Sequence, residues 1–414
     1  MDRSINIPPP EVPSGKNLRK NEVKKDLHFN FATPLFGSEV SKEEQDLVTP
    51  VRVPSIRGQL RFWWRALAGN ACSSFRELKE KEDRVWGSTS SRSSVSVVVK
   101  NVFIPEKGGN HNSPPNYVVF PYRQSKVKPL ENVAFDLEVK YPEELEKEVL
   151  AALWGWSNFG GLGARTRRGG GSLFCAEMAP PSHEPDDLRK WFSEWFGRIA
   201  YEPSSIVPDW PVFKGSVYLG PVQSNPYSAW EKSIGVLERF RQGEGIGRNK
   251  GSSGRQGRSR WPEADSIRRI TGKSSPRHKP SPEKPEKAFP RAELGLPIIM
   301  WFKDRRDGDP GNVTLSPSKK GERVERMASP LILKVLALKN NKYLPLCLCL
   351  GTPALEGIYV DEGRKKECYG ASGLSDPSFS KYPGSPMSGR SDRGSAVEAF
   401  LAFACENGFK EVSK

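Results

Sequence analysis

The pattern of apolar and polar positions divides the first half of the chain into strands and helices. Residues 25–36 alternate polar with apolar side chains, as a half-buried strand does. Three further segments, rich in β-branched and aromatic residues, also predict strands: 95–104, 117–122 and 133–140. Residues 142–157 space their apolar side chains helically and are followed by two glycines, so they predict a helix that stops there.

The segment 51–67, VRVPSIRGQLRFWWRAL, predicts a helix with two different stripes. Ser55 is a suitable N-cap for it. One face is apolar and consists of Ile56, Leu60, Trp63 and Leu67. Arginines form the second stripe beside that face, at positions 57, 61 and 65. A strand in the segment SLFCAEM completes the order strand, helix, strands, helix, strand, which resembles a ferredoxin-like βαββαβ unit.

The second half shows a similar pattern with more decoration. Its predicted strands are 211–220, 294–303, 329–338 and 343–351, of which the last two suggest a hairpin. Its predicted helices are 228–243 and 395–407. We therefore predict an α+β protein with two ferredoxin-like (RRM-like) βαββαβ domains. The predicted boundaries are a flexible arm at 1–24, a first domain at 25–180, a helical connector at 181–210 and a second domain at 211–414.

Composition narrows the class of protein. The chain has 414 residues, of which 64 are Lys or Arg and 49 are Asp or Glu, for a net charge of +15. A protein this basic usually meets a polyanion, nucleic acid first, although the charge could instead serve solubility alone. Six cysteines and four histidines are scattered without ligand-like spacing, so we expect no metal or cofactor. The N-terminal residues do not resemble a secretory signal and no segment is apolar enough to span a membrane, so we expect a cytoplasmic protein with no membrane partner.

Residues 241–290 differ from the rest of the chain. They contain 13 Lys or Arg against 5 Asp or Glu and are rich in Gly, Ser and Pro. The composition predicts a long basic loop inserted in the second domain, partly disordered when free.

Two segments carry candidate phosphate contacts. In the first, Arg57 occupies the first turn of a helix, where a bound phosphate would favour a cation, and Gly58 would let a backbone approach. The alternative is a solvated arginine stripe lying over aromatic surface. In the second, NFGGLGARTRRGGGSL, a glycine-rich loop with three arginines follows a helix and precedes a strand. That order differs from a dinucleotide or P-loop fingerprint but suits a sugar–phosphate chain; an ordinary turn with solvated charge is the alternative.

Together these motifs resemble the RAMP superfamily, the repeat-associated proteins of CRISPR effector complexes. The segments SRWPEADSIRRITG, PRAELGLPIIMWF and RMASPLILKV are similar to the family of first subunits of the type III-B Cmr complex. The resemblance implies a non-catalytic RNA-binding subunit that caps the complex at the 3′ end of the guide RNA. Its implied partners are the CRISPR guide RNA, a captured single-stranded target RNA and other Cmr subunits, with pairing between guide and target reading the sequence.

The resemblance also implies a set of RNA-binding residues. The first motif supplies Ser55, Arg57, Gly58 and Arg61. The glycine-rich loop supplies Gly160, Gly161, Gly163, Arg165, Arg167, Arg168 and Gly169. The subunit-specific motif supplies Arg260, Trp261 and Arg268. No string of stacking aromatics of the RRM type is present, so we do not expect the sheet itself to stack bases.

Two other functions compete with this one. RAMP relatives that cut RNA use either a histidine or an aspartate before the first helix. His28 has no second group committed to it in the sequence, whereas Asp46, or Glu43 or Glu44, could lie near a bound strand and support a metal-dependent endoribonuclease. A solvated acidic loop is the plainer reading of that segment. A general DNA-binding protein or nucleic-acid chaperone would fit the charge alone.

Overall fold

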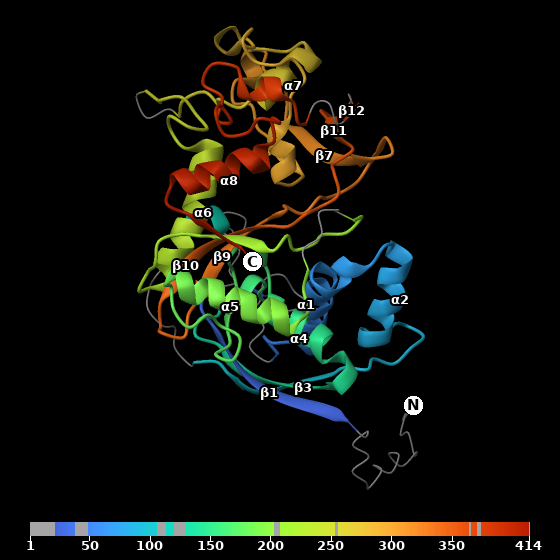
Figure 1. The fold of residues 1–414 in the computed structure, drawn as a ribbon. Helices are drawn as coiled ribbons and strands as arrows, with labels where there is room; N and C mark the ends of the chain where they lie inside the picture. The colour runs from blue at the N-terminus through green and yellow to red at the C-terminus, as the bar shows by residue number, and fades with distance from the viewer. Residues whose placement is uncertain are drawn as a thin grey trace, which may run out of the picture.

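The computed structural model describes residues 21–37, 49–105, 113–119, 129–202, 208–252, 256–363, 366–370 and 374–413. These residues form antiparallel sheets with helices packed against them, so the predicted α+β class is confirmed (Figure 1). The predicted N-terminal arm lies outside the described residues up to residue 20, and the first strand already begins at Glu22.

The first sheet orders its strands β2-β3-β1-β4, and all neighbours are antiparallel. The strands are β1 (Glu22–Phe31), β2 (Ser96–Phe103), β3 (Ala134–Pro142) and β4 (Leu173–Phe174). Helices α1 (Val53–Ala66) and α2 (Phe75–Trp86) lie between β1 and β2, and α4 (Glu146–Phe159) lies between β3 and β4. Apart from α2, which we did not predict, and the strand expected at 117–122, this is the order of elements that the sequence predicts.

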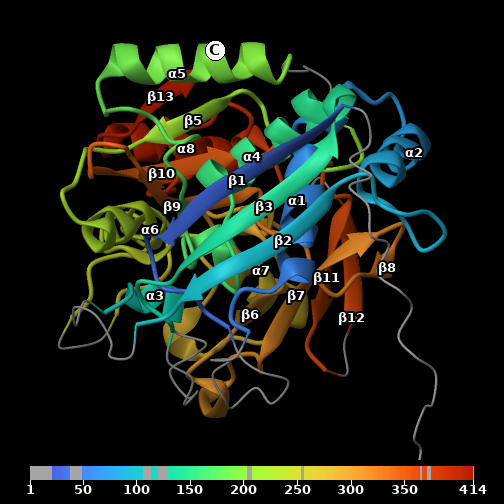
Figure 2. The same ribbon diagram turned by 90° about the horizontal axis from the view of Figure 1, so that it is seen from below.

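Alternation of apolar residues explains why this sheet has one covered face. Phe29 and Phe135 point inward from neighbouring strands and stack with their ring centroids 5.2 Å apart. Helices α1 and α4 cover that face and are tied to each other by a 2.8 Å hydrogen bond from Trp64 Nε1 to Glu148 Oε2. Figure 2 shows the opposite face of β1, β3 and β2 with no helix over it.

The second sheet repeats this arrangement, with strand order β13-β5-β10-β9. Its strands are β5 (Ser216–Leu219), β9 (Leu331–Ala337), β10 (Tyr343–Cys349) and β13 (Lys410–Ser413). Helix α6 (Pro226–Gln242) follows β5, and α8 (Ala396–Glu406) precedes β13. The hairpin of β9 and β10 and both helices lie where the sequence predicts them. The predicted strand at 294–303 is different, because it does not belong to this sheet.

A third sheet, which the sequence analysis did not predict, is built from two insertions in the second half. Its order is β12-β11-β7-β6, and β8 pairs with β7. Three strands lie between α6 and β9: β6 (Ile298–Met300), β7 (Val313–Lys319) and β8 (Glu322–Arg323). Two lie between β10 and α8: β11 (Gly357–Asp361) and β12 (Lys366–Gly370). With helix α7 (Glu263–Thr271) they form what we call the inserted module, which has its own apolar cluster.

The prediction of a long, partly disordered basic loop at 241–290 is wrong for the residues of this segment that the structure describes. Helix α7 lies inside it, and most of its remaining backbone is placed in turns against the module. Its apolar side chains explain the difference, because Trp261, Ile267, Ala288 and Phe289 are fully buried. The many basic residues of this segment led us to overlook the few apolar side chains that fix it in place.

Two shorter segments also differ from prediction. Residues 117–119 belong to a short helix, α3 (Asn116–Val119), where we expected a strand at 117–122; the rest of that segment lies outside the described residues. The strand expected in SLFCAEM is only β4, two residues long.

Tryptophan-rich helices join the first and second sheets into one core. Helix α5 (Pro185–Arg198), within the predicted connector, packs Trp191 and Trp195 against Trp154 of α4 at centroid distances of 5.4 and 5.9 Å. The same cluster includes Leu346 of β10. Because large aromatic side chains dominate core energetics, this cluster holds the two sheets in a fixed relation.

Candidate nucleic-acid interface

Helix α1 begins earlier than expected and without a side-chain cap. Its N-cap is Arg52, and Pro54 lies in its first turn. Proline fits there because it has no N–H to leave unpaired, so Ser55 is displaced from the cap position into the first turn. The first turn has no acidic side chain. Its unpaired amides and the helix dipole therefore present a positive end without an internal counter-charge.

The glycine-rich loop between α4 and β4 needs glycine for steric reasons at two points. Gly163 has φ +81°, and a Cβ there would lie 2.3 Å from the carbonyl oxygen of Phe36. Gly171 has φ +62°, and a Cβ would lie 2.0 Å from the oxygen of Leu162. The loop folds tightly against the segment after β1, and only a chain without side chains at these positions can do so.

A cavity of about 460 Å³, which we call the loop cavity, brings the two predicted motifs together. Ser55 and Gly58 of α1 line one side, and Gly163 of the loop lines the other. Arg52 is the charged residue among the described residues that line it. Gly58 is exposed, and a Cβ built there meets nothing within 4 Å. Geometry of this kind, a helix start facing a glycine-rich backbone, suits an anion.

The arginines of the first motif point elsewhere. Arg57 donates to the backbone oxygens of Trp86, at 2.7 Å, and Val95, at 3.2 Å. Arg61 donates from Nε to Glu82 of α2 at 2.6 Å, and Arg65 pairs with the same carboxylate. Arg57 and Arg61 line a separate hollow beside α2. The structure thus splits the motif: Ser55 and Gly58 face the loop, while the arginine stripe fastens α1 to α2.

Two of the three loop arginines hold the halves of the molecule together. Arg167 donates from Nη1 to the oxygen of Ser329, and Arg168 to that of Leu331 at 3.1 Å. Burial lowers the pKa of both guanidinium groups, and lowers that of Arg168 to about 10, so Arg168 stays charged at neutral pH. These contacts occupy donors that the sequence analysis assigned to phosphate.

The glycines that flank these arginines are part of the same joint. Lys334 of β9 is buried and donates from Nζ to the oxygen of Gly160 at 2.6 Å. Trp156 Nε1 donates to the oxygen of Gly161 at 3.0 Å. At Gly169 a Cβ would lie 2.5 Å from Nε1 of Trp230. Sequence reasoning missed Lys334, although a single lysine inside the apolar run LILKVLAL was a signal for it.

Arg165 lies on the other side of the loop, in a second and larger hollow. This hollow, about 790 Å³ and here called the arginine cavity, is lined by Arg165, Arg168 and Arg241 of α6. Its further lining comes from α3 and from the residues around β6. Glu238 is the acidic residue among the described lining residues, so positive charge prevails. The loop therefore lies between two hollows, both of which suit a polyanion.

In the subunit-specific motif, all three predicted RNA-binding residues contact other parts of the protein. Trp261 is fully buried against Phe240, and its Nε1 donates to the oxygen of Arg241. Arg268 is also buried and binds both carboxylate oxygens of Asp309, at 2.9 and 3.0 Å. Arg260 donates to the backbone oxygen of Gly245. In this conformation Trp261 and Arg268 have almost no surface with which to contact RNA. Trp261 packs in the apolar cluster around α6, and Arg268 binds Asp309 within the inserted module.

The open face of the first sheet is polar at its centre. All four aromatic side chains of β1 and β3 are buried: Phe29, Phe31, Phe135 and Tyr141. On the open face, His28 Nδ1 lies 2.7 Å from Asp136 Oδ1, so the histidine has a carboxylate partner that the sequence did not reveal. Hydrogen bonds from Lys100, Lys140 and Lys24 lower the pKa of Glu138 to about 2. On this face the two central strands expose no Phe, Tyr or Trp ring; the exposed ring is the imidazole of His28, which is paired with Asp136.

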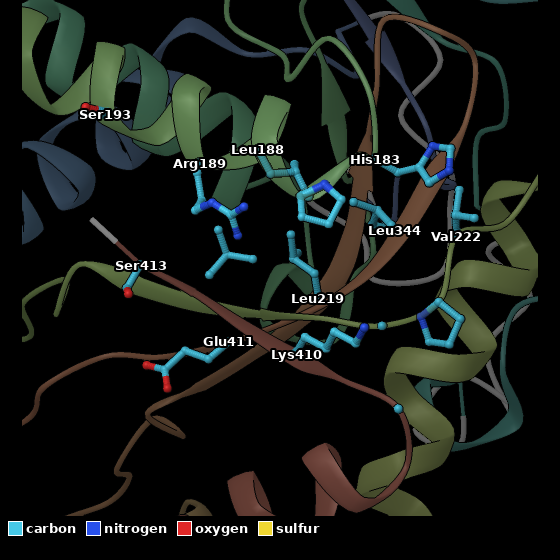
Figure 3. Close-up of a pocket in the computed structure, with 15 residues that line it drawn as sticks. His183, Leu188, Arg189, Ser193, Leu219, Val222, Leu344, Lys410, Glu411 and Ser413 are labelled. Carbon is cyan, nitrogen blue, oxygen red and sulfur yellow. The ribbon is translucent and has the colours of Figure 1, made fainter.

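A further hollow of about 700 Å³ lies far from both motifs, between α5 and the strands β5 and β13. Figure 3 shows Leu188 and Arg189 of α5 facing Leu219, Lys410 and Glu411 across it. None of the residues predicted to bind RNA lines this hollow.

Within the described ranges, no group of three or more His, Cys, Asp or Glu is arranged to hold a metal ion. No described helix is long and apolar enough to cross a membrane. Asp46, Glu43 and Glu44 lie outside the described residues, but Gly37 and Pro50 on either side of that segment line the loop cavity.

Comparison with known proteins gives the class. A model of the RAMP superfamily matches residues 28–174. The CRISPR system Cmr subunit Cmr1-1 of Pyrococcus furiosus is 31% identical over 146 residues, which cover 30% of this chain and 40% of that protein. Cmr subunit Cmr1-2 of the same organism is 30% identical over 149 residues, which cover 29% of this chain and 79% of that protein.

Two solved Cmr structures align with most of this chain. The crystal structure of Cmr1 from Pyrococcus furiosus in its apo form aligns with 80% of this chain and 89% of that one, with a TM-score of 0.49 and 19% identity. A type III-B Cmr-beta structure bound to cognate target RNA aligns with 80% and 95%, with a TM-score of 0.43 and 12% identity. The sequence matches define a RAMP-superfamily protein. Within that superfamily, the chain belongs to the Cmr1 family.

Proposed function

We propose that this protein is a non-catalytic RNA-binding subunit of a type III-B CRISPR effector complex. In this role it caps the complex at the 3′ end of the guide RNA and contacts both guide and captured target. Its family membership supports the assignment, because its curated relatives are named as Cmr subunits. The residues proposed to contact RNA are Ser55, Gly58, Gly163 and Arg165.

The observation that carries the proposal is the loop cavity. The start of α1 opens into it without an acidic residue, and the glycine-rich backbone forms its opposite wall. A phosphate in this space would meet helix amides from one side and a backbone free of side chains from the other. Contacts of this kind bind the sugar–phosphate chain and leave sequence to base pairing.

Gly58→Glu tests this site with little risk to the fold, since Gly58 is exposed and has open space around it. A carboxylate at the helix start should repel a phosphate and weaken binding of single-stranded RNA roughly 5- to 10-fold. Gly58→Gln adds a side chain of the same size without the charge and is the matched control. The measurement is RNA affinity across a salt series, in which fewer phosphate contacts give a shallower slope.

Equal affinities for the two Gly58 variants would place the phosphate contacts outside the loop cavity. The same titration should include duplex DNA and a guide–target duplex. Equal affinity for all of these ligands would favour a general nucleic-acid chaperone over the proposed subunit.

A metal-dependent endoribonuclease is the second candidate. The observation in its favour is that the residues on both sides of the acidic segment 38–48 line the loop cavity. Incubating the RNA with protein and Mg²⁺ and running a denaturing gel separates the two functions. Cleavage that is lost in Asp46→Ala, with binding retained, would replace the non-catalytic assignment.

A further inference from the structure

Strand β6 presents two large apolar side chains to solvent. Ile299 is 57% exposed and Trp301, just after the strand, is 75% exposed. Their neighbours on the opposite face are buried, since Ile298 is 8% and Phe302 only 7% exposed. This alternation means that Ile299 and Trp301 share one face of an extended segment whose other face is anchored in the inserted module.

The anchored face fixes the position of the exposed one. Phe302 belongs to the apolar cluster of the module, and the guanidinium of Arg268 lies 5.0 Å from its ring centroid. Arg268 in turn is held by Asp309. In the part of the chain that the structure describes, no aromatic ring or cation stacks on Trp301 itself. Trp301 therefore leaves a large aromatic surface open to a partner.

The exposed face adjoins the arginine cavity. Ile299 lines that cavity together with Arg165 and Arg168 of the loop and Arg241 of α6. Trp301 follows two positions later on the same face, about 7 Å further along an extended chain. An aromatic ring therefore stands beside a hollow in which cationic groups prevail.

We propose that Trp301 stacks on a base of single-stranded RNA whose phosphates occupy the arginine cavity. The inference rests on the proposed RNA-binding function and assigns it a second contact, on the inserted module. A cationic groove next to an exposed aromatic ring is the arrangement by which proteins bind single strands. A protein partner is less well matched, because a tryptophan at a protein interface is ringed by contacts that exclude water, whereas here three guanidinium groups line the adjoining hollow.

The test measures the affinity of the full chain for single-stranded RNA of about 15 nucleotides. Trp301→Ala should weaken binding about 5- to 150-fold, the loss typical of one stacked base. Trp301→Phe keeps a ring and should retain most of the affinity, whereas Trp301→Leu keeps only apolar surface and should behave like alanine. Phe75→Ala removes an aromatic side chain with a similar exposure, 62%, at the start of α2, and should leave binding unchanged.

An RNA of the same length with abasic positions gives a second readout. It keeps the phosphates but offers no ring, so wild type and Trp301→Ala should bind it equally. Full binding by Trp301→Leu, or an equal loss on abasic RNA, would overturn stacking and indicate a general apolar contact such as a protein interface.

The failure of this inference differs from the failure of the proposed function. If wild type does not bind RNA, the proposed RNA-binding function is wrong, and the proposed stacking of Trp301 on a base is wrong with it. If wild type binds RNA and Gly58→Glu weakens it while Trp301→Ala does not, the loop cavity stands and the stacking contact is wrong.

Discussion

At the scale of single residues, the main lesson is that arginine and lysine serve the fold as much as they could serve a ligand. Arg168 and Lys334 are bound to backbone oxygens across the joint between the two sheets. The sequence placed Arg168 in a glycine-rich loop, which suggested an open surface. It could not show that β9, more than 160 residues later, supplies the partner.

Lys334 gives a prediction about pH. Burial lowers its pKa to about 7, far below its ordinary value of 10.5. Between these values the unfolded chain binds the extra proton, so the free energy of unfolding rises with pH by at most about 1.4 kcal/mol per unit from this residue. Below pH 7 the cost of burying the charge is fully present.

The test compares the free energy of urea unfolding of wild type and Lys334→Met from pH 6 to 9. This range spans the lowered pKa of Lys334. Wild type should gain stability relative to the variant as pH rises above about 7. Lys342→Met, at an exposed position, controls for the loss of one charge. A difference between wild type and Lys334→Met that does not change with pH would mean that the lysine does not titrate in this range.

At the scale of elements, the arginine stripe of α1 explains how α2 is held. We expected either a phosphate or solvent to meet that stripe, and the structure shows a helix instead. A capping box signals this helix in the sequence, since Ser74 accepts from the amide of Glu77 and Glu77 in turn accepts from Ser73. Had α2 been predicted from this pattern, the carboxylate that pairs with Arg61 and Arg65 would have been expected on the face of α2 that packs against α1.

Glu82→Ala should therefore loosen α2 from α1. Glu82 is buried and accepts from both Arg61 and Arg65, and its loss leaves two guanidinium groups without their carboxylate, at a cost of about 1–3 kcal/mol. Glu80→Ala breaks only an exposed pair with Arg76 and should cost at most about 0.5 kcal/mol. Urea unfolding gives the two losses, and hydrogen exchange should show faster exchange in α2 of the first variant. Similar losses for both would show that the arginine stripe does not fasten α2.

At the scale of the whole molecule, the sequence predicted the order of elements in two sheets and missed the third. Long segments with a regular apolar pattern, such as α6 and β9, can be predicted from the sequence. The third sheet cannot, because β7 contains Pro317 and four polar residues, β11 has five residues, and their pairing joins two separate insertions. Likewise Ser55, Gly58 and Gly163 meet in the loop cavity as their motifs suggest, while Trp261 and Arg268 found partners that no local pattern encodes.

The inserted module has its own charged centre, which gives a prediction at this scale. Asp265 is buried and contacts Arg258 at 2.6 Å, Arg268 at 3.2 Å and Lys284 at 3.3 Å. Asp265→Ala removes the carboxylate that these three cations share, although Arg268 keeps Asp309, and should destabilise the module by about 3–5 kcal/mol. The exposed Asp307→Ala on the same module is the control.

Limited proteolysis should cut Asp265→Ala within 243–330 while fragments of the first sheet survive, because the module has a separate apolar cluster. Loss of the entire fold in a single transition would show that the module and the two sheets unfold together.

The position of β5 has a consequence for how the chain is made. The first sheet is complete once Phe174 has been synthesised, so it can fold while the ribosome is still adding the second half. Strand β5 lies between β10 and β13, and it obtains its second neighbour only when Ser413 has emerged. Contacts this distant in sequence form slowly, and an unpaired strand edge invites association with other chains. The synthesis of β13 is therefore the step that protects the second half from aggregation.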